Sequence, residues 1–191
     1  PQWGRVWSRA SDVQVEVPGL SDVGARRDVS QLCQMHQGTE NTMRRYRVFI
    51  LEDSPERMRA IREAAFEHWD VFHAEDVATA RTLFPDLHNS VDGLDLILLD
   101  HDLGGETYVP TDHPNTGSAF CRWMVYNYPN GVSCPILVHS WNKAGADTMI
   151  GLLRTRPGFA LWEPYGPTIL SILAEWSRTH AADAGGQHGT V

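Results

Sequence analysis

From residue 46 onward, short apolar runs alternate with segments in which apolar residues recur every three or four positions. Continuous apolar runs are typical of strands buried on both faces of a sheet, and the second pattern is typical of amphipathic helices. The predicted strands cover residues 48–51, 71–73, 94–99, 135–138 and 159–162, which are apolar except at His73 and Asp95. Because a helix pattern follows each strand pattern, the sequence predicts an α/β fold with a parallel sheet and helices on both faces.

The number of strand–helix units limits which parallel α/β fold the chain can adopt. An eight-stranded barrel needs about 250 residues, whereas the five units here fall within residues 46–180. A flavodoxin-like sheet with the strand order 2-1-3-4-5 fits five units, and its first and third strands are neighbours. We therefore expect a functional site where these strands end, because ligands bind at that crevice in open α/β sheets.

The first 42 residues do not share this pattern. Their apolar residues are scattered, and glycines and prolines interrupt any period. We predict an N-terminal extension over 1–42 that is poorly ordered or lies outside the core, with packing of Trp3 and Trp7 against the domain as the alternative. The α/β domain is predicted over 43–180, followed by a flexible tail over 181–191.

The net charge and the cysteine content limit which partners the protein can bind and in which cellular compartment we expect it. The chain has 16 Lys and Arg against 24 Asp and Glu, a net charge of -8, so its overall field repels duplex nucleic acid and anionic lipid. Three cysteines without C-x-x-C spacing argue against a disulfide framework. No apolar run approaches the ~20 residues that span a bilayer. We expect a cytoplasmic protein that binds neither membrane nor duplex nucleic acid, with a homodimer left open.

Polar residues gather where the predicted strands end. Glu52 and Asp53 follow the first strand, and Asp100 follows the third. Carboxylates that converge on one crevice repel one another unless a cation neutralises them. Oxygen ligands suit Mg²⁺, which keeps waters that a phosphate can replace. We therefore predict that Glu52, Asp53 and Asp100 hold a divalent metal, Mg²⁺ in preference to Mn²⁺ or Zn²⁺. Capping of the next helix by a single acid is the competing interpretation.

This arrangement resembles the receiver domain of two-component signalling over about residues 46–180. That family uses an acidic pair after strand one, here Glu52 and Asp53, and an aspartate after strand three, here Asp100. A hydroxyl residue follows strand four, here Ser140. The resemblance implies that these residues hold Mg²⁺ and accept a phosphoryl group.

Two further segments resemble a narrower branch, the cyclic-phosphate-processing receiver domain. They read Leu99-Asp100-His101-Asp102-Leu103-Gly104-Gly105 and Val138-His139-Ser140-Trp141-Asn142, the second being followed by Gly145-Ala146 and Met149. The resemblance implies a protein that binds or hydrolyses a cyclic-phosphate or nucleotide-like ligand, with a divalent metal as its cofactor. The expected partner is therefore a small phosphate-containing ligand.

Two histidines at strand ends suit that chemistry. Opening a cyclic phosphodiester needs a base for the attacking water and an acid for the leaving oxygen, and imidazole titrates near neutrality. We therefore predict that His101 and His139 are the acid–base residues, with Asp102 orienting one of them or joining the metal. For each histidine, satisfaction by loop carbonyls is the competing interpretation.

Several neighbouring residues are candidate ligand contacts. A pair of glycines offers backbone N–H groups to a phosphate, or else forms a turn. An indole can stack on a base or belong to the core, and a lysine at a helix start is a nearby cation. The predicted ligand-binding residues are Gly104, Gly105, Ser140, Trp141, Asn142 and Lys143.

A non-enzymatic signalling module is the alternative function. Such a receiver is phosphorylated at Asp100 or binds partners around it. Receivers carry a lysine at the end of strand five, whereas this chain has Glu163 there. That departure weakens the signalling interpretation, and the two histidines add chemistry that signalling does not need.

Overall fold

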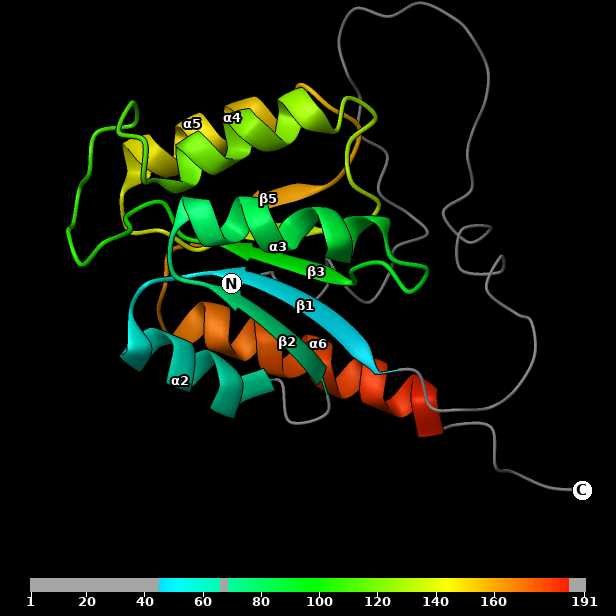
Figure 1. The fold of residues 1–191 in the computed structure, drawn as a ribbon. Coiled ribbons are helices and arrows are strands. Elements are labelled where there is room, and N and C mark those ends of the chain that lie inside the picture. Colours follow the sequence, from blue (N-terminus) through cyan, green and yellow to red (C-terminus); the bar gives the residue numbers. More distant parts are fainter. Residues whose placement is uncertain (1–44, 66–68, 186–191) are drawn as a thin grey trace, which may run out of the picture. The chain divides into compact units, whose positions relative to one another are not determined.

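The computed structural model describes residues 45–65 and 69–185 (Figure 1). The predicted extension over 1–42 lies outside the described residues, as do residues 186–191 of the predicted tail. The strands are β1 (Tyr46–Leu51), β2 (Trp69–Ala74), β3 (Leu96–Leu99), β4 (Ile136–Val138) and β5 (Ala160–Trp162). The helices are α2 (Pro55–Ala65), α3 (Val77–Asn89), α4 (Gly117–Asn127), α5 (Lys143–Leu153) and α6 (Pro167–Gly185). Helix α6 continues past residue 180, where the α/β domain was predicted to end.

The five strands form one parallel sheet in the order β2-β1-β3-β4-β5. Helices α3, α4 and α5 cover one face of the sheet, and α2 and α6 cover the other (Figure 1). The predicted flavodoxin-like fold, its strand order and its two helical layers are therefore confirmed. None of the helices in the described part of the chain is long and apolar enough to cross a membrane.

Strand β1 shows how the apolar runs build both cores. Phe49 and Leu51 belong to the cluster beneath α3, α4 and α5, whereas Val48 and Ile50 belong to the cluster beneath α2 and α6. Successive side chains of a strand point to opposite faces of the sheet. A strand covered on both faces must therefore be apolar at every position, as the unbroken run in the sequence indicates.

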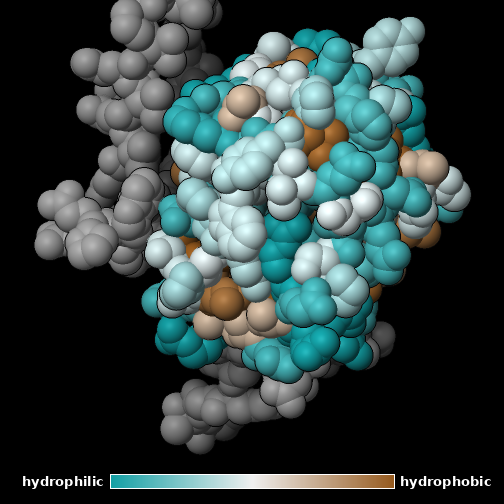
Figure 2. Space-filling model, turned by 90° about the vertical axis from the view of Figure 1, so that its left-hand side faces the viewer, coloured by the Kyte–Doolittle hydropathy of each residue, from teal (hydrophilic) through white to brown (hydrophobic). Residues whose placement is uncertain are grey.

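The register of the central strands brings the polar strand ends together. Leu51 pairs with Leu99 across β1 and β3, and Leu99 pairs with Val138 across β3 and β4. The residues that follow each strand therefore leave the sheet side by side. Figure 2 looks at this end of the molecule, and its surface is mostly hydrophilic with small, separated hydrophobic patches.

Candidate functional site

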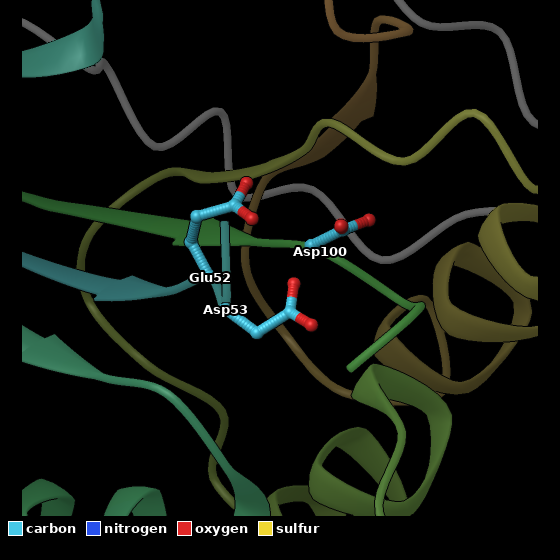
Figure 3. Close-up of side chains that lie close together, drawn as sticks. All are labelled: Glu52, Asp53 and Asp100. Atoms are coloured by element: carbon cyan, nitrogen blue, oxygen red, sulfur yellow. The ribbon is translucent and has the colours of Figure 1, made fainter. Parts of the chain in front are cut away.

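Glu52, Asp53 and Asp100 form an acidic cluster at the ends of β1 and β3. Each offers one carboxylate oxygen, and these three oxygens lie within 4.8 Å of one another. Figure 3 shows the three carboxyl groups arranged around a common space. The Glu52 and Asp100 side chains are 0% and 1% exposed, and Asp53 is partly buried. The structure thus brings together the three residues predicted to hold a metal.

Burial changes the protonation of the acidic cluster. It raises the pKa of Glu52 from 4.5 to about 8, and the neighbouring Asp100 carboxylate adds to the rise. It also raises the pKa of Asp100, where Arg57 and the Ser140 hydroxyl oppose the change. In the metal-free protein, Glu52 is therefore protonated at neutral pH, which reduces the repulsion among the carboxylates.

Arg57 is a site residue that sequence reasoning missed. Its Nη2 atom lies 2.7 Å from Asp100 Oδ2, 3.0 Å from Glu52 Oε1 and 3.5 Å from Asp53 Oδ1. Helix α2 begins directly after strand β1, so a residue four positions after Asp53 faces back toward the strand end. That spacing was the one available signal, because nothing else in the sequence separates Arg57 from the other arginines of α2.

Two aromatic rings flank the Arg57 guanidinium. Its central carbon lies 5.6 Å from the centroid of the Trp141 ring and 5.7 Å from that of the Tyr165 ring. The Trp141 indole N–H donates a hydrogen bond to the backbone oxygen of Tyr165 at 2.6 Å, which fixes the ring beside the arginine. Distances below about 6 Å are in the range of cation–π attraction.

His139 follows strand β4 and lies next to Glu52 of the acidic cluster. The side chain is fully buried, and its Nδ1 atom lies 3.6 Å from Glu52 Oε2. Within the described residues, neither ring nitrogen of His139 nor Glu52 Oε2 has a hydrogen-bond partner. Burial and the positive charge of Arg57 lower the pKa of His139 to about 3. The imidazole is therefore neutral at physiological pH, and a pKa this low makes it a weak base.

His101 follows strand β3 and packs against helix α5. Its side chain is fully buried, and burial lowers its pKa. A Cβ atom added at Gly145 would lie only 1.7 Å from His101 Cδ2, so the ring occupies the space that a side chain at 145 would need. The acid–base roles of His101 and His139 stay predictions, because neither ring is exposed on the surface that the structure presents.

Asp102 holds the loop that connects β3 to α4. Its carboxylate accepts hydrogen bonds from the backbone N–H groups of Tyr108 and Val109, each at 2.9 Å. It also accepts one from Asn142 Nδ2 at 2.9 Å, and Oδ1 of the same Asn142 side chain caps α5 by accepting the N–H of Gly145. Asp102 Oδ1 lies 3.6 Å from the nearer ring nitrogen of the preceding histidine, beyond hydrogen-bond distance. These contacts of Asp102 and Asn142 therefore stabilise the loop and the start of helix α5.

The other predicted ligand contacts divide into two groups. Gly104 and Gly105 have positive φ angles of 89° and 77°, which glycine adopts without strain, and the Gly105 N–H donates a hydrogen bond to Asp53. This turn therefore supports the acidic cluster. Lys143 instead forms a 2.6 Å ion pair with Asp147, and Ser140 is fully buried beside the cluster.

An open groove of about 480 Å³ adjoins the acidic cluster. It is lined by the start of α2, by residues 105–108 of the loop and by Trp141. Tyr108 and Trp141 are large aromatic residues on its walls, 71% and 56% exposed. Small-molecule sites commonly have volumes of about 300–1,000 Å³, so the groove has room for a ligand of nucleotide size.

The profile of the cyclic-phosphate processing receiver domain matches residues 47–155. The chain belongs to this family. The matched segment runs from β1 to just beyond α5, and β5 and α6 complete the sheet and its second helical layer. The protein is therefore a receiver domain of the response-regulator type, which confirms the family predicted from the motifs.

The solved structures to which the chain is similar include three receiver domains. The response regulator domain of Thermotoga maritima CheB has a TM-score of 0.47 and 16% identity, covering 74% of this chain and 98% of that chain. The non-phosphorylated receiver domain of the Escherichia coli stress response regulator RcsB has a TM-score of 0.44 and 18% identity, covering 75% and 95%. The signal receiver domain of an HD domain-containing protein from Pseudomonas fluorescens Pf-5 has a TM-score of 0.45 and 13% identity, covering 73% and 99%. A comparison with curated proteins found no match.

Proposed function

We propose that this receiver domain binds a divalent cation at Glu52, Asp53 and Asp100 and a small phosphate ester in the adjoining groove. The observation that carries the proposal is the convergence of three carboxyl groups, two of them buried, beside an open groove. Buried carboxylates are stable only when they are neutralised, paired or bound to a metal. Arg57 brings one positive charge to three acids, so a divalent cation improves the charge balance.

The atoms of the acidic cluster favour a hard metal ion. The three acids of the cluster offer oxygen, and Glu52 Oε2 is buried with no hydrogen-bond partner among the described residues. Mg²⁺ and Mn²⁺ prefer oxygen ligands, whereas Zn²⁺ sites usually include nitrogen or sulfur. We therefore place Mg²⁺ or Mn²⁺ ahead of Zn²⁺. Once bound, such an ion stabilises negative charge on phosphate oxygens.

The walls of the groove support a nucleotide-like ligand of the cyclic-phosphate class. Tyr108 and Trp141 offer exposed aromatic surface, on which a base can stack. Asp53 of the acidic cluster and Arg57 line the same groove, so a phosphate bound to the metal can lie at this end of it. The ligand thus spans a charged end and an aromatic end.

Hydrolysis of the cyclic phosphate is the finer part of the proposal. Burial lowers the pKa of both His139 and His101 and makes their imidazoles weak bases, so an acid–base role requires that the negative charge of the bound phosphate raise these pKa values. His139 is the better placed of the two, because its Nδ1 lies 3.6 Å from Glu52 Oε2.

A ligand and turnover assay tests the proposal. The protein is incubated with 2′,3′-cyclic nucleotides, 3′,5′-cyclic nucleotides or ADP-ribose 1″,2″-cyclic phosphate, each with Mg²⁺, Mn²⁺ or Zn²⁺. Binding is followed by calorimetry and hydrolysis by chromatography. If hydrolysis occurs, His139→Gln should lower its rate by about 10² to 10⁴, the usual effect of losing an acid–base residue. The exposed His113→Gln change should leave it unaltered.

The outcomes separate the alternatives. Metal-dependent binding without hydrolysis supports a ligand-binding receiver, and hydrolysis supports an enzyme. If no compound binds with any metal, the proposed ligand class is wrong. Modification of Asp100 by acetyl phosphate under the same conditions would then favour the signalling module.

The affinity for Mg²⁺ should rise with pH up to about pH 8. The pKa of Glu52 is about 8 in the metal-free protein, so below that pH a proton must leave before the carboxylate can bind the ion. Each pH unit below 8 should then weaken the apparent affinity by up to about tenfold. Calorimetric titrations at about pH 6, 7 and 8 measure this change, and an affinity independent of pH would contradict it.

A further inference from the structure

We propose that Arg57 is a phosphate-binding residue that the acidic cluster retains in the metal-free protein and that metal binding frees for the ligand. The metal and the phosphate ligand then bind cooperatively, each increasing the affinity for the other. This inference rests on the metal site proposed above and extends it to the order in which the site is filled.

Arg57 and a divalent cation compete for the same three carboxylates. The Arg57 Nη2 atom lies within 3.5 Å of an oxygen from each of Glu52, Asp53 and Asp100. These are the three residues whose carboxylates converge to form the candidate metal site. A cation placed among them would meet like-charge repulsion from the guanidinium and would take over its carboxylate partners.

When a cation displaces Arg57 from the carboxylates, the arginine side chain stays beside the groove. The residue lines the groove, and its side chain is 17% exposed. The rings of Trp141 and Tyr165 flank the guanidinium and favour a cation there whether or not the carboxylates are available. The planar N–H donors of arginine suit the oxygens of a phosphate.

Apart from Arg57, the groove has no positively charged residue among the described residues that line it and could bind a phosphate. Within the described part of the chain, Arg57 is the sole basic residue of the groove lining. The lining also contains four acids, Asp53, Glu56, Asp102 and Glu106. A phosphate entering the metal-free groove would therefore meet repulsion while the one guanidinium is engaged with carboxylates. Metal binding reduces the negative charge of the groove and frees the Arg57 guanidinium. Phosphate should therefore bind more tightly when the metal is bound.

The coupling between the two ligands is measurable with inorganic phosphate as the probe. Calorimetry gives the Mg²⁺ affinity of the full chain with and without phosphate. In the wild type, phosphate should tighten Mg²⁺ binding by at least about fivefold, the lower end of usual coupling between sites. In Arg57→Gln, Mg²⁺ alone should bind more tightly than in the wild type, and phosphate should tighten Mg²⁺ binding by less than it does in the wild type. Arg59→Gln, an exposed position on the same helix, should behave like the wild type.

Two results would overturn the inference. One is weaker Mg²⁺ binding in Arg57→Gln without phosphate, which would mean that the guanidinium supports the metal. The other is a phosphate effect as large as in the wild type. If Arg57→Gln does not fold, Arg57→Lys keeps the charge without the planar donors and should show a smaller phosphate effect. An unchanged effect in that variant would also overturn the inference.

The metal site itself is tested separately in the same experiment. If the wild type binds no Mg²⁺, or if Asp100→Asn binds it equally well, the proposed metal site fails and the inference fails with it. If Asp100→Asn loses Mg²⁺ binding but Arg57→Gln matches the wild type with and without phosphate, only the role of Arg57 is wrong.

Discussion

Asp100→Asn should lower the affinity for Mg²⁺ by about a hundredfold or more. Asp100 is buried within the acidic cluster, where solvent screens its charge poorly. Unit charges about 4 Å apart attract by about 4 kcal/mol at an effective dielectric constant of about 20, and about 1.4 kcal/mol changes a dissociation constant tenfold. Asparagine keeps the shape and the carbonyl oxygen but removes that charge. Calorimetric titration of both proteins with Mg²⁺ measures the difference.

The matched control for this variant is Asp86→Asn. Asp86 is exposed on helix α3 and is not part of the acidic cluster, so its loss should leave Mg²⁺ affinity unchanged. Thermal melting of both variants verifies that they are folded. An Asp100→Asn protein that is folded and binds Mg²⁺ as tightly as the wild type would place the ion elsewhere.

Gly145→Ala should destabilise the protein, although alanine normally favours a helix over glycine. A Cβ atom at 145 would lie 1.7 Å from His101 Cδ2 and 2.3 Å from its Cγ. Overpacking of this kind usually costs about 1–3 kcal/mol, more than the ~1 kcal/mol that helix propensity returns. The net loss of up to about 2 kcal/mol should lower the melting temperature by up to about 8 °C, as measured by circular dichroism.

Gly151 offers the control in the same helix. A Cβ atom there would meet nothing within 4 Å, so Gly151→Ala should keep or raise the melting temperature. His101→Ala removes the ring that causes the clash. The double variant His101→Ala, Gly145→Ala should therefore be less destabilised than the sum of its single changes. A stable Gly145→Ala protein would show that the ring can move aside.

The sheet and the acidic cluster were predictable because they depend on local patterns. An unbroken apolar run is what a strand between two helical layers requires, and the residues after such runs must lie at one edge of a parallel sheet. The limits of β3 were less predictable. The apolar run begins at Leu94, but the strand begins at Leu96 because the Asp95 carboxylate accepts the N–H of Arg47 before the ladder starts.

The packing around the cluster could not be predicted in the same way. Arg57 and Arg59 are both arginines of one amphipathic helix, and only the path of α2 over the strand ends decides which reaches the acids. Burial of His101 depends on a glycine more than forty positions away in the sequence, Gly145. The bonds of Asp102 to the loop depend on how that loop folds back, for which the sequence contains no periodic signal.

The way in which Asp102 holds the loop determines which residues of the groove can be substituted during evolution. The Asp102 carboxylate binds the backbone N–H groups of Tyr108 and Val109, which do not depend on the side chain at 108. Residue 108 has a φ angle of 58°, which asparagine and glycine adopt more readily than tyrosine does. Substitutions at 108 can therefore exchange the aromatic wall while the loop keeps its course. Related chains could thus acquire new ligand preferences at this one position without altering the carboxylates on the opposite side.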